Sequence, residues 1–153
     1  MANIVELYQR LANKPLGKRL FSRAVVWRAP YFGTIKPQIR ELRAGCCEVF
    51  MRNRHAVHNH IGTVHAIAMC NLCEIAGGLL IDATLKRELR WIPRGMTVRY
   101  LKKADTDLTA VADWVDNLAS DFQGDVVMHI PVQNTAGETV MTADISMYVS
   151  PRK

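Results

Sequence analysis

The 153-residue chain is long enough for one domain with a hydrophobic core. Its hydrophobic fraction of 49% and its mixture of acidic and basic residues are typical of a soluble globular protein. Residues 1–30 lack the continuous apolar run of a signal peptide, so the sequence predicts a cytoplasmic protein. The net charge of +6 is compatible with a nucleic acid, with a ligand that carries several phosphates, or with solubility alone.

Two short helices are predicted before Gly33. Apolar residues recur at helical spacing from Ile4 to Leu11, and Pro15 interrupts the pattern. A second apolar series, residues 16–25, follows the proline. This section either caps one end of the domain or covers a substrate channel, and the sequence leaves both readings open.

A buried helix is predicted in the middle of the chain. Strands are expected at residues 34–43 and 46–52, and the segment from Val64 to about Leu85 then leaves almost no polar face. The apolar run is short for a membrane span, and Asn71 and Glu74 interrupt it. A buried carboxylate is costly unless it is paired or hydrogen-bonded, which makes Glu74 a candidate functional residue.

The loop before this helix is rich in polar side chains. Its polar and glycine residues are Asn59, His60, Gly62, Thr63 and His65. Gly62 and Thr63 predict the start of the helix, with Thr63 as its N-cap. Unpaired backbone N–H groups are then expected near residues 64–66, where they would stabilise a developing negative charge.

Strands dominate the sequence after the helix. A connection is expected from Arg90 to Arg94, and alternating apolar side chains predict strands at residues 96–101, 108–115, 125–132 and 141–149. Residues 134–137 predict a hairpin turn, and such short turns join antiparallel strands. We therefore expect an α+β domain in which one curved antiparallel sheet wraps around one long buried helix.

Cysteine and histidine spacing raises the question of a metal or redox site. Cys70 and Cys73 have CxxC spacing, but they fall inside the apolar helix rather than at a helix start. Cys46 and Cys47 are a poor zinc pair, so we interpret all four cysteines as small buried residues. The metalloprotein alternative would use the histidines His55, His58, His60 and His65.

The order of these elements resembles the hotdog-fold acyl-CoA thioesterase superfamily, in particular small bacterial proteins of the phenylacetate-pathway thioesterase type. The resemblance runs from about Gly33 to Pro151, so that residues 34–150 would form the hotdog core of a single domain and residues 1–33 a helical extension. It depends on Asn59-x-x-Gly62-x-x-His65-Ala66, on Glu74 eight residues later, and on the run TVRYLKKA at residues 97–104.

The resemblance implies a thioester hydrolase that works as a homodimer or as a dimer of dimers, without a cofactor or a metal. Asn59 and the backbone N–H of Ala66 match groups that bind the thioester carbonyl, although glycine is commonest at the position of Ala66. Glu74 of the neighbouring subunit matches the carboxylate that attacks the carbonyl or activates water, and His65 matches a residue that orients the thioester. The candidate substrate-binding residues are Gly62, Gly78, Arg99, Tyr100 and Lys102, the basic ones as partners for the phosphates of acyl-coenzyme A.

Three other functions remain open from the sequence. A hotdog protein could bind an acyl-CoA or a lipid without cleaving it, and Glu74 would then be a structural carboxylate. The metalloprotein using loop histidines is the second alternative. A nucleic-acid binder ranks last because aromatic residues do not alternate with Lys and Arg along one element. We expect neither a nucleic-acid partner nor a membrane partner.

Overall fold

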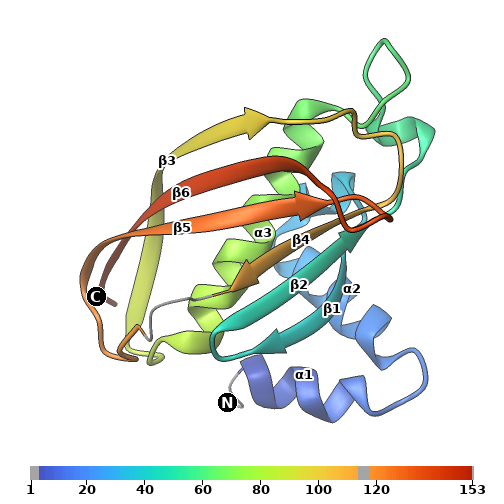
Figure 1. The fold of residues 1–153 in the computed structure, drawn as a ribbon. Helices are drawn as coiled ribbons and strands as arrows, with labels where there is room; N and C mark the ends of the chain where they lie inside the picture. Colours follow the sequence, from blue (N-terminus) through green and yellow to red (C-terminus); the bar gives the residue numbers. More distant parts are fainter. Residues whose placement is uncertain (1–3, 114–117, 153) are drawn as a thin grey trace.

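The computed structural model describes residues 4–113 and 118–152 (Figure 1). In chain order the elements are α1 (Ile4–Ala12), α2 (Gly17–Arg28), the 3-10 helix η1 (Pro30–Thr34), β1 (Gln38–Arg43), β2 (Cys46–Met51), the 3-10 helix η2 (His55–Val57), α3 (Ala66–Thr84), β3 (Leu89–Tyr100), β4 (Leu108–Asp113), β5 (Gly124–Gln133) and β6 (Thr139–Pro151). The strands form one sheet in the order β1-β2-β4-β5-β6-β3, and every neighbouring pair is antiparallel. The predicted α+β fold, a curved antiparallel sheet around one long helix, is confirmed.

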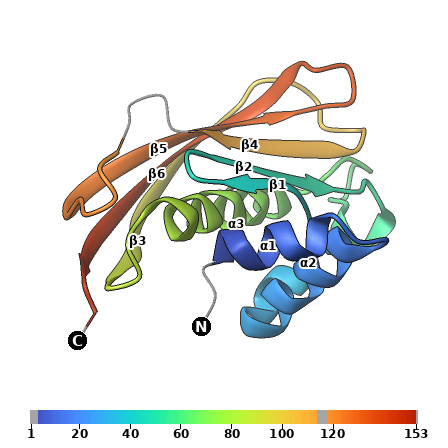
Figure 2. The same ribbon diagram turned by 90° about the horizontal axis from the view of Figure 1, so that it is seen from below.

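The central helix α3 is buried because almost every side chain on it is apolar. Figure 2 shows α3 between the concave face of the sheet and the N-terminal helices α1 and α2. Its apolar composition would allow it to cross a membrane, but 67% of its most apolar window is buried inside the domain. Gly77 lets the helix approach the sheet, since a Cβ atom there would lie 2.7 Å from Met128 Cε and 3.0 Å from Ile130 Cδ1.

The inner face of the sheet follows the predicted alternation of side chains. On β6 the residues that point into the core are Met141, Ala143, Ile145, Met147 and Val149, all fully buried. The predicted hairpin turn joins β5 to β6. Trp114 and Val115, the last two residues of the predicted strand 108–115, lie outside the described residues.

Two local predictions are wrong. Residues 34–37 were expected to begin a strand, but Thr34 ends η1 and Lys36 has a left-handed φ of 48°, so β1 begins only at Gln38. The expected connection from Arg90 to Arg94 is part of β3. A strand can continue through Pro93 because β3 forms one edge of the sheet, and a register shift between Pro93 and Gly95 absorbs the irregularity.

The N-terminal helices are fixed to the edge strand β1 by specific contacts. Tyr8 and Phe21 pack edge to face with ring centroids 5.1 Å apart, and Tyr8 Oη donates to the carbonyl of Arg40 at 2.6 Å. Burial raises the pKa of Tyr8 to about 12, so the phenol keeps the proton that it donates. Ser22 Oγ accepts from the N–H of Ile39 at 2.9 Å. The extension is therefore an integral layer of the domain.

The junction between α1 and α2 yields a test of this packing. A Cβ atom on Gly17 would lie 1.7 Å from the backbone oxygen of Leu11, whereas one on Gly95 would have nothing within 4 Å. We expect Gly17→Ala to lower the free energy of unfolding by about 1–3 kcal/mol, because backbone atoms must move to admit the methyl group. Gly95→Ala is the matched control. Equal urea midpoints for the two variants would contradict this account of the junction.

Candidate active site

The start of α3 is capped by a histidine side chain. His65 is the N-cap residue, with φ −64° and ψ 138°, and its Nδ1 accepts from the N–H of Ile67 at 3.0 Å. A ring nitrogen that accepts a hydrogen bond carries no proton, so the neutral ring has its proton on Nε2. The side chain is exposed, which leaves the Nε2–H group free to donate to a ligand.

The prediction that Thr63 caps the helix is wrong. The N–H of Val64 donates to the carbonyl of Ala104, and the N–H of His65 donates to the carbonyl of Val57, both at 2.8 Å. These two bonds hold residues 64 and 65 as extended chain, so the helix cannot begin before Ala66. Contacts with distant residues, which the local sequence does not contain, therefore determine the helix start.

The first backbone donor of this helix, the N–H of Ala66, has no partner among the described residues. It lies in the first turn of α3, where the helix dipole favours negative charge. It is therefore a backbone donor that a negatively charged ligand atom could accept from.

Asn59 organises the loop before these donors. Its Oδ1 accepts from the N–H groups of Ile61 and Thr63, both at 3.1 Å, and its Nδ2 donates to Thr63 Oγ1 at 2.8 Å. The bend also requires Gly62, whose φ of +79° favours glycine. The side-chain oxygen of Asn59 is fully used, so the residue shapes the loop, and only its second Nδ2 hydrogen remains for a ligand.

A pocket of about 210 Å³ opens beside the helix start. Among the residues that line it are Tyr31, Thr34, His58, His65, Ile67 and Asn71. Asn71 is 5% exposed, and its Nδ2 donates to Thr34 Oγ1 at 3.1 Å. Its Oδ1 is buried with no hydrogen-bond partner among the described residues, so a buried acceptor is left for a ligand donor.

Asn71 and its neighbours were not predicted as site residues. Arg54 donates from Nη2 to the carbonyl of Thr34 at 2.6 Å, while its Nε is buried and has no partner in the described part of the chain. One signal was present in the sequence: an amide side chain inside an apolar helix, three residues before Glu74. Thr34 and Arg54 come from other segments, and their proximity to Asn71 depends on the tertiary fold.

Glu74 lies on a separate surface of α3, in an apolar groove of about 320 Å³ between this helix and the N-terminal helices. Apolar lining residues come from both sides, among them Leu7, Phe21, Val25, Phe32, Ile75 and Leu79. Glu74 is half-buried and makes no hydrogen bond or ion pair with any other described residue. The carboxylate of Glu74 is therefore available to a ligand in this groove, which Arg28 and Asp82 also line.

Gly78 contributes to this groove by making room for a tryptophan. A Cβ atom on Gly78 would lie 2.8 Å from the ring of Trp91 on β3, and Trp91 Nε1 donates to Asp82 Oδ1 at 2.9 Å. The space beside Gly78 is therefore filled by the same chain. Both Gly78 and Trp91 line the groove, next to Glu74.

The remaining candidate residues, Arg99, Tyr100 and Lys102, lie on β3 or directly after it. Tyr100 Oη lies 3.8 Å from Sγ of Cys70, one helical turn before Glu74, and partial burial raises the pKa of Tyr100. Lys102 forms an ion pair with Glu138 at 2.5 Å, so its charge is already neutralised. Arg99 is exposed and forms no ion pair with another described residue.

The contacts and burial of the loop histidines and the cysteines bear on the alternative of a metal site. His58 Nε2 lies 2.6 Å from Asn53 Oδ1, an oxygen that can only accept. Within residues 4–113 and 118–152, no three His, Cys, Asp or Glu side chains are close enough together to hold a metal ion. Cys46, Cys47 and Cys73 are buried as predicted, and burial raises the pKa of all three thiols, whereas Cys70 is half-buried.

The structure thus divides the predicted site residues into two groups on one helix. The first group, Asn59, Gly62, His65 and Ala66, surrounds the start of α3. Glu74 and Gly78 lie further along it. Glu74 lies eight positions after Ala66, and a rise of 1.5 Å per residue places their backbones about 12 Å apart along the helix axis. A single carbonyl group therefore cannot contact both groups of one chain.

The role of Asn59 in the loop leads to a prediction. Asn59→Ala removes the acceptor of two backbone N–H groups, and we expect the free energy of unfolding to fall by about 1–3 kcal/mol. Asn59→Asp keeps an oxygen at Oδ1 and should lose less. Urea denaturation of both variants tests this, and an Asn59→Ala protein as stable as wild type would show that the loop does not depend on this side chain.

Proteins of known structure share the fold of this chain. The chain is 42% identical to the genomics target APC5556, with a TM-score of 0.84, over 99% of this chain and 100% of that one. A probable thioesterase, PA5026 from Pseudomonas aeruginosa, matches with 18% identity and a TM-score of 0.74 over 88% of this chain and 94% of its own. The thioesterase HI1161 from Haemophilus influenzae matches with 14% identity and a TM-score of 0.71 over 99% of this chain and 92% of its own.

These two thioesterases are too distant in sequence to show more than a shared fold, which is the hotdog fold that the sequence predicted. No curated protein matches the sequence. A family model, described only as a domain of unknown function, DUF4442, matches residues 17–149. That match includes α2 and nearly all of the sheet, and the chain belongs to the DUF4442 family.

Proposed function

We propose that the protein hydrolyses acyl-coenzyme A thioesters at a site that two subunits form together. The observation that carries this proposal is a pair of groups on α3 that have no hydrogen-bond partner among the described residues: the N–H of Ala66 and the carboxylate of Glu74, about 12 Å apart along the helix axis. The likeness of the fold to thioesterases supports the same reaction.

The donors at the helix start would polarise the thioester carbonyl. The N–H of Ala66 and the Nε2–H of His65 would donate to the carbonyl oxygen as it gains negative charge. Preorganised donors of this kind contribute about 3–4 kcal/mol each to the stabilisation of a transition state. A thioester is an activated acyl group, so one base is enough to complete the chemistry.

Glu74 of the partner subunit would supply that base. The carboxylate takes a proton from a water molecule, and the water oxygen forms a bond to the carbonyl carbon. The carbon–sulfur bond then breaks, and the thiolate of coenzyme A receives the proton from Glu74. The products are a carboxylic acid and the free thiol. Hydrolysis through direct attack by the carboxylate uses the same residue.

A homodimer would bring the two groups together, and a dimer of dimers is compatible with it. β3 has strand β6 on one side only, so its other edge is open to a second chain. Large apolar side chains that are more than half exposed lie on or beside this edge and at the start of α3: Ile67, Ile92, Tyr100 and Leu101. Pairing of two β3 edges would bury them.

Binding without hydrolysis is the second candidate function. The observation in its favour is Asn59, whose Nδ2 already donates to Thr63 Oγ1, so that only one of its two N–H hydrogens is left for a substrate carbonyl. An acyl-CoA would then bind in the same place, and Glu74 would have no chemical role.

Substitution of the carboxylate distinguishes the two functions. Glu74→Gln keeps the size of the side chain but removes its basicity, so we expect kcat for acyl-CoA hydrolysis to fall by about 10²–10³-fold. Because Glu74 has no partner in the described chain, the free energy of unfolding should change by less than about 0.5 kcal/mol. Glu88→Gln, at an exposed residue, is the control. A folded Glu74→Gln protein with normal turnover would remove Glu74 from the mechanism, whereas a wild-type protein that binds acyl-CoA without hydrolysing it would favour the binding function.

Complementation tests whether the site is shared. Ala66→Pro removes the backbone donor, yet proline is favoured at the first helical position, and His65 already has the extended conformation required before proline. This variant and Glu74→Gln should each lose about 10²-fold or more in kcat. Refolded together in equal amounts, they should regain about a quarter of wild-type activity, since half of the dimers are mixed and each of these has one intact site.

The mixture must be shown by native mass spectrometry to contain mixed dimers. If it does and its activity stays at the level of the single variants, the two groups do not act on one thioester from different subunits. A protein that is monomeric by light scattering at micromolar concentration would contradict the shared site independently.

A further inference from the structure

The positive charge of the protein is concentrated at its N-terminal side. Residues 7–40 contain eight of the 20 Lys and Arg residues and none of the 14 Asp and Glu residues. The remainder of the chain is therefore slightly acidic. This segment includes α2 and η1, which contribute residues to a cavity of the described structure.

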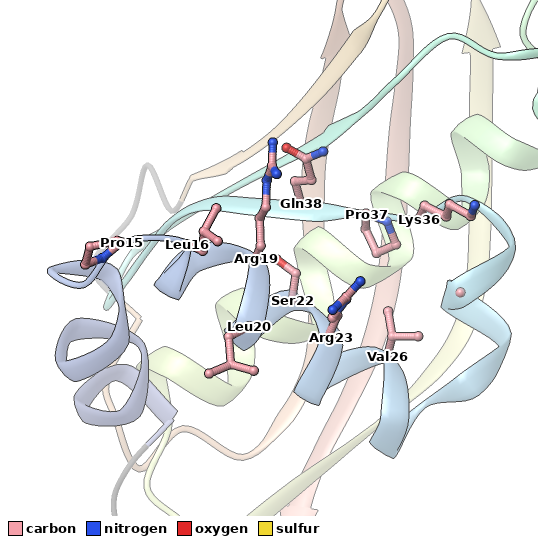
Figure 3. Close-up of a pocket in the computed structure, with 11 residues that line it drawn as sticks. Pro15, Leu16, Arg19, Leu20, Ser22, Arg23, Val26, Lys36, Pro37 and Gln38 are labelled. Carbon is pink, nitrogen blue, oxygen red and sulfur yellow. The ribbon is translucent and has the colours of Figure 1, made fainter.

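That cavity is a cleft of about 700 Å³ between α2 and residues 33–38 (Figure 3). Arg19 and Arg23 project from α2, and Lys36 comes from the opposite wall, beside Pro37. None of these three cations forms an ion pair with another described residue, and no carboxylate is among the residues that line the cleft. Unpaired cations around a concave surface concentrate the electrostatic potential there.

The backbone of Lys36 is a second, independent observation. Its φ of 48° is left-handed, a conformation that residues other than glycine rarely adopt. The N–H of Lys36 donates to the carbonyl of Gly33 at 3.2 Å, which closes the turn that carries the side chain. A strained residue at the wall of a charged cleft is typical of a binding site.

The cleft is a neighbour of the donors at the start of α3. Gly33 and Lys36 line the cleft, while Thr34 and Ile35 line the 210 Å³ pocket that also contains His65. One turn of chain therefore separates the two cavities. The buried and unpartnered Oδ1 of Asn71 lies on the pocket side of this turn.

We propose that this cleft binds the phosphate groups of coenzyme A while the thioester lies at the start of α3 in the same subunit. This assignment rests on the proposed function. The guanidinium groups of Arg19 and Arg23 bind phosphate oxygens in pairs, and Lys36 adds a third cation. The amide-containing arm of coenzyme A crosses the turn at residues 33–36, where Asn71 Oδ1 accepts from one of its N–H groups.

The walls of the cleft suit the remainder of the nucleotide. Leu16, Leu20, Val26 and Pro37 give it an apolar lining beside the cations. By contrast, the ammonium group of Lys102, which the sequence suggested as a phosphate partner, forms an ion pair with Glu138. The proposal thus assigns the phosphates to the N-terminal extension rather than to the strand that follows α3.

An anionic membrane is the alternative occupant of this surface, because Trp27 is 85% exposed and Leu16 is 69% exposed beside the same cations. Coenzyme A is favoured because the cations surround a concave cleft next to the candidate active site, whereas a bilayer would contact a convex surface. Coenzyme A titration and vesicle co-sedimentation distinguish these two occupants.

The test compares coenzyme A binding by the wild-type protein and by the double variant Arg19→Gln/Arg23→Gln in isothermal titration calorimetry. Loss of two charged hydrogen-bonding groups should raise the Kd for coenzyme A about tenfold or more. It should have a smaller effect on 3′-dephospho-coenzyme A, which lacks one phosphate. Arg43→Gln/Arg90→Gln, with the same loss of charge on exposed residues elsewhere, should bind within about twofold of wild type.

A second readout uses thioester hydrolysis. The ratio of kcat/KM for an acyl-CoA to kcat/KM for the matching acyl-N-acetylcysteamine thioester, which has no phosphates, should fall about tenfold in Arg19→Gln/Arg23→Gln. If the wild-type protein hydrolyses neither thioester, the proposed function fails, and the calorimetric difference still tests the cleft.

Equal coenzyme A affinities in the wild-type protein and in Arg19→Gln/Arg23→Gln would overturn the proposal. The membrane alternative predicts that pattern together with weaker co-sedimentation of the double variant with phosphatidylglycerol vesicles. Circular dichroism and the urea midpoint confirm beforehand that the double variant is folded.

Discussion

The burial of α3 is the constraint on which the rest of the structure depends. The sheet covers one side of this apolar helix and the N-terminal helices cover another, so its polar groups can meet a ligand at only a few places. One is its first turn, where the N–H of Ala66 is free and His65 acts as the cap. The other is the groove at Glu74. A helix packed against the sheet holds both groups in place, which is what catalysis by preorganised dipoles requires.

The same helix also keeps Ala66 and Glu74 apart. Its rise places Glu74 about 12 Å from Ala66, so a reaction that needs both groups needs two helices. The open edge of β3 offers a way to bring a second helix close. On the other side of the helix start, one turn of chain leads to the basic cleft of the N-terminal extension. In the proposed mechanism the chemistry would take place between two subunits, and the phosphates would be recognised within one subunit.

The features that were predictable from the sequence are those that depend on local patterns. The apolar run of α3 and the alternation on β6 gave the helix, the strands and the way they pack. The helix start was misplaced because the bonds of Val64 and His65 to Ala104 and Val57 depend on tertiary structure. For the same reason, Asn71 could be seen as unusual, but its pairing with Thr34 could not be foreseen. The cleft combines side chains from two segments and was missed entirely.

A crystal structure of the Glu74→Gln protein with an uncleaved acyl-CoA would test the central claim most directly. The account predicts the carbonyl oxygen of the thioester within hydrogen-bond distance of the N–H of Ala66 in one subunit. It also predicts that the substituted residue 74 beside the carbonyl carbon belongs to the other subunit. A thioester bound away from the start of α3, or next to residue 74 of the same subunit, would contradict it.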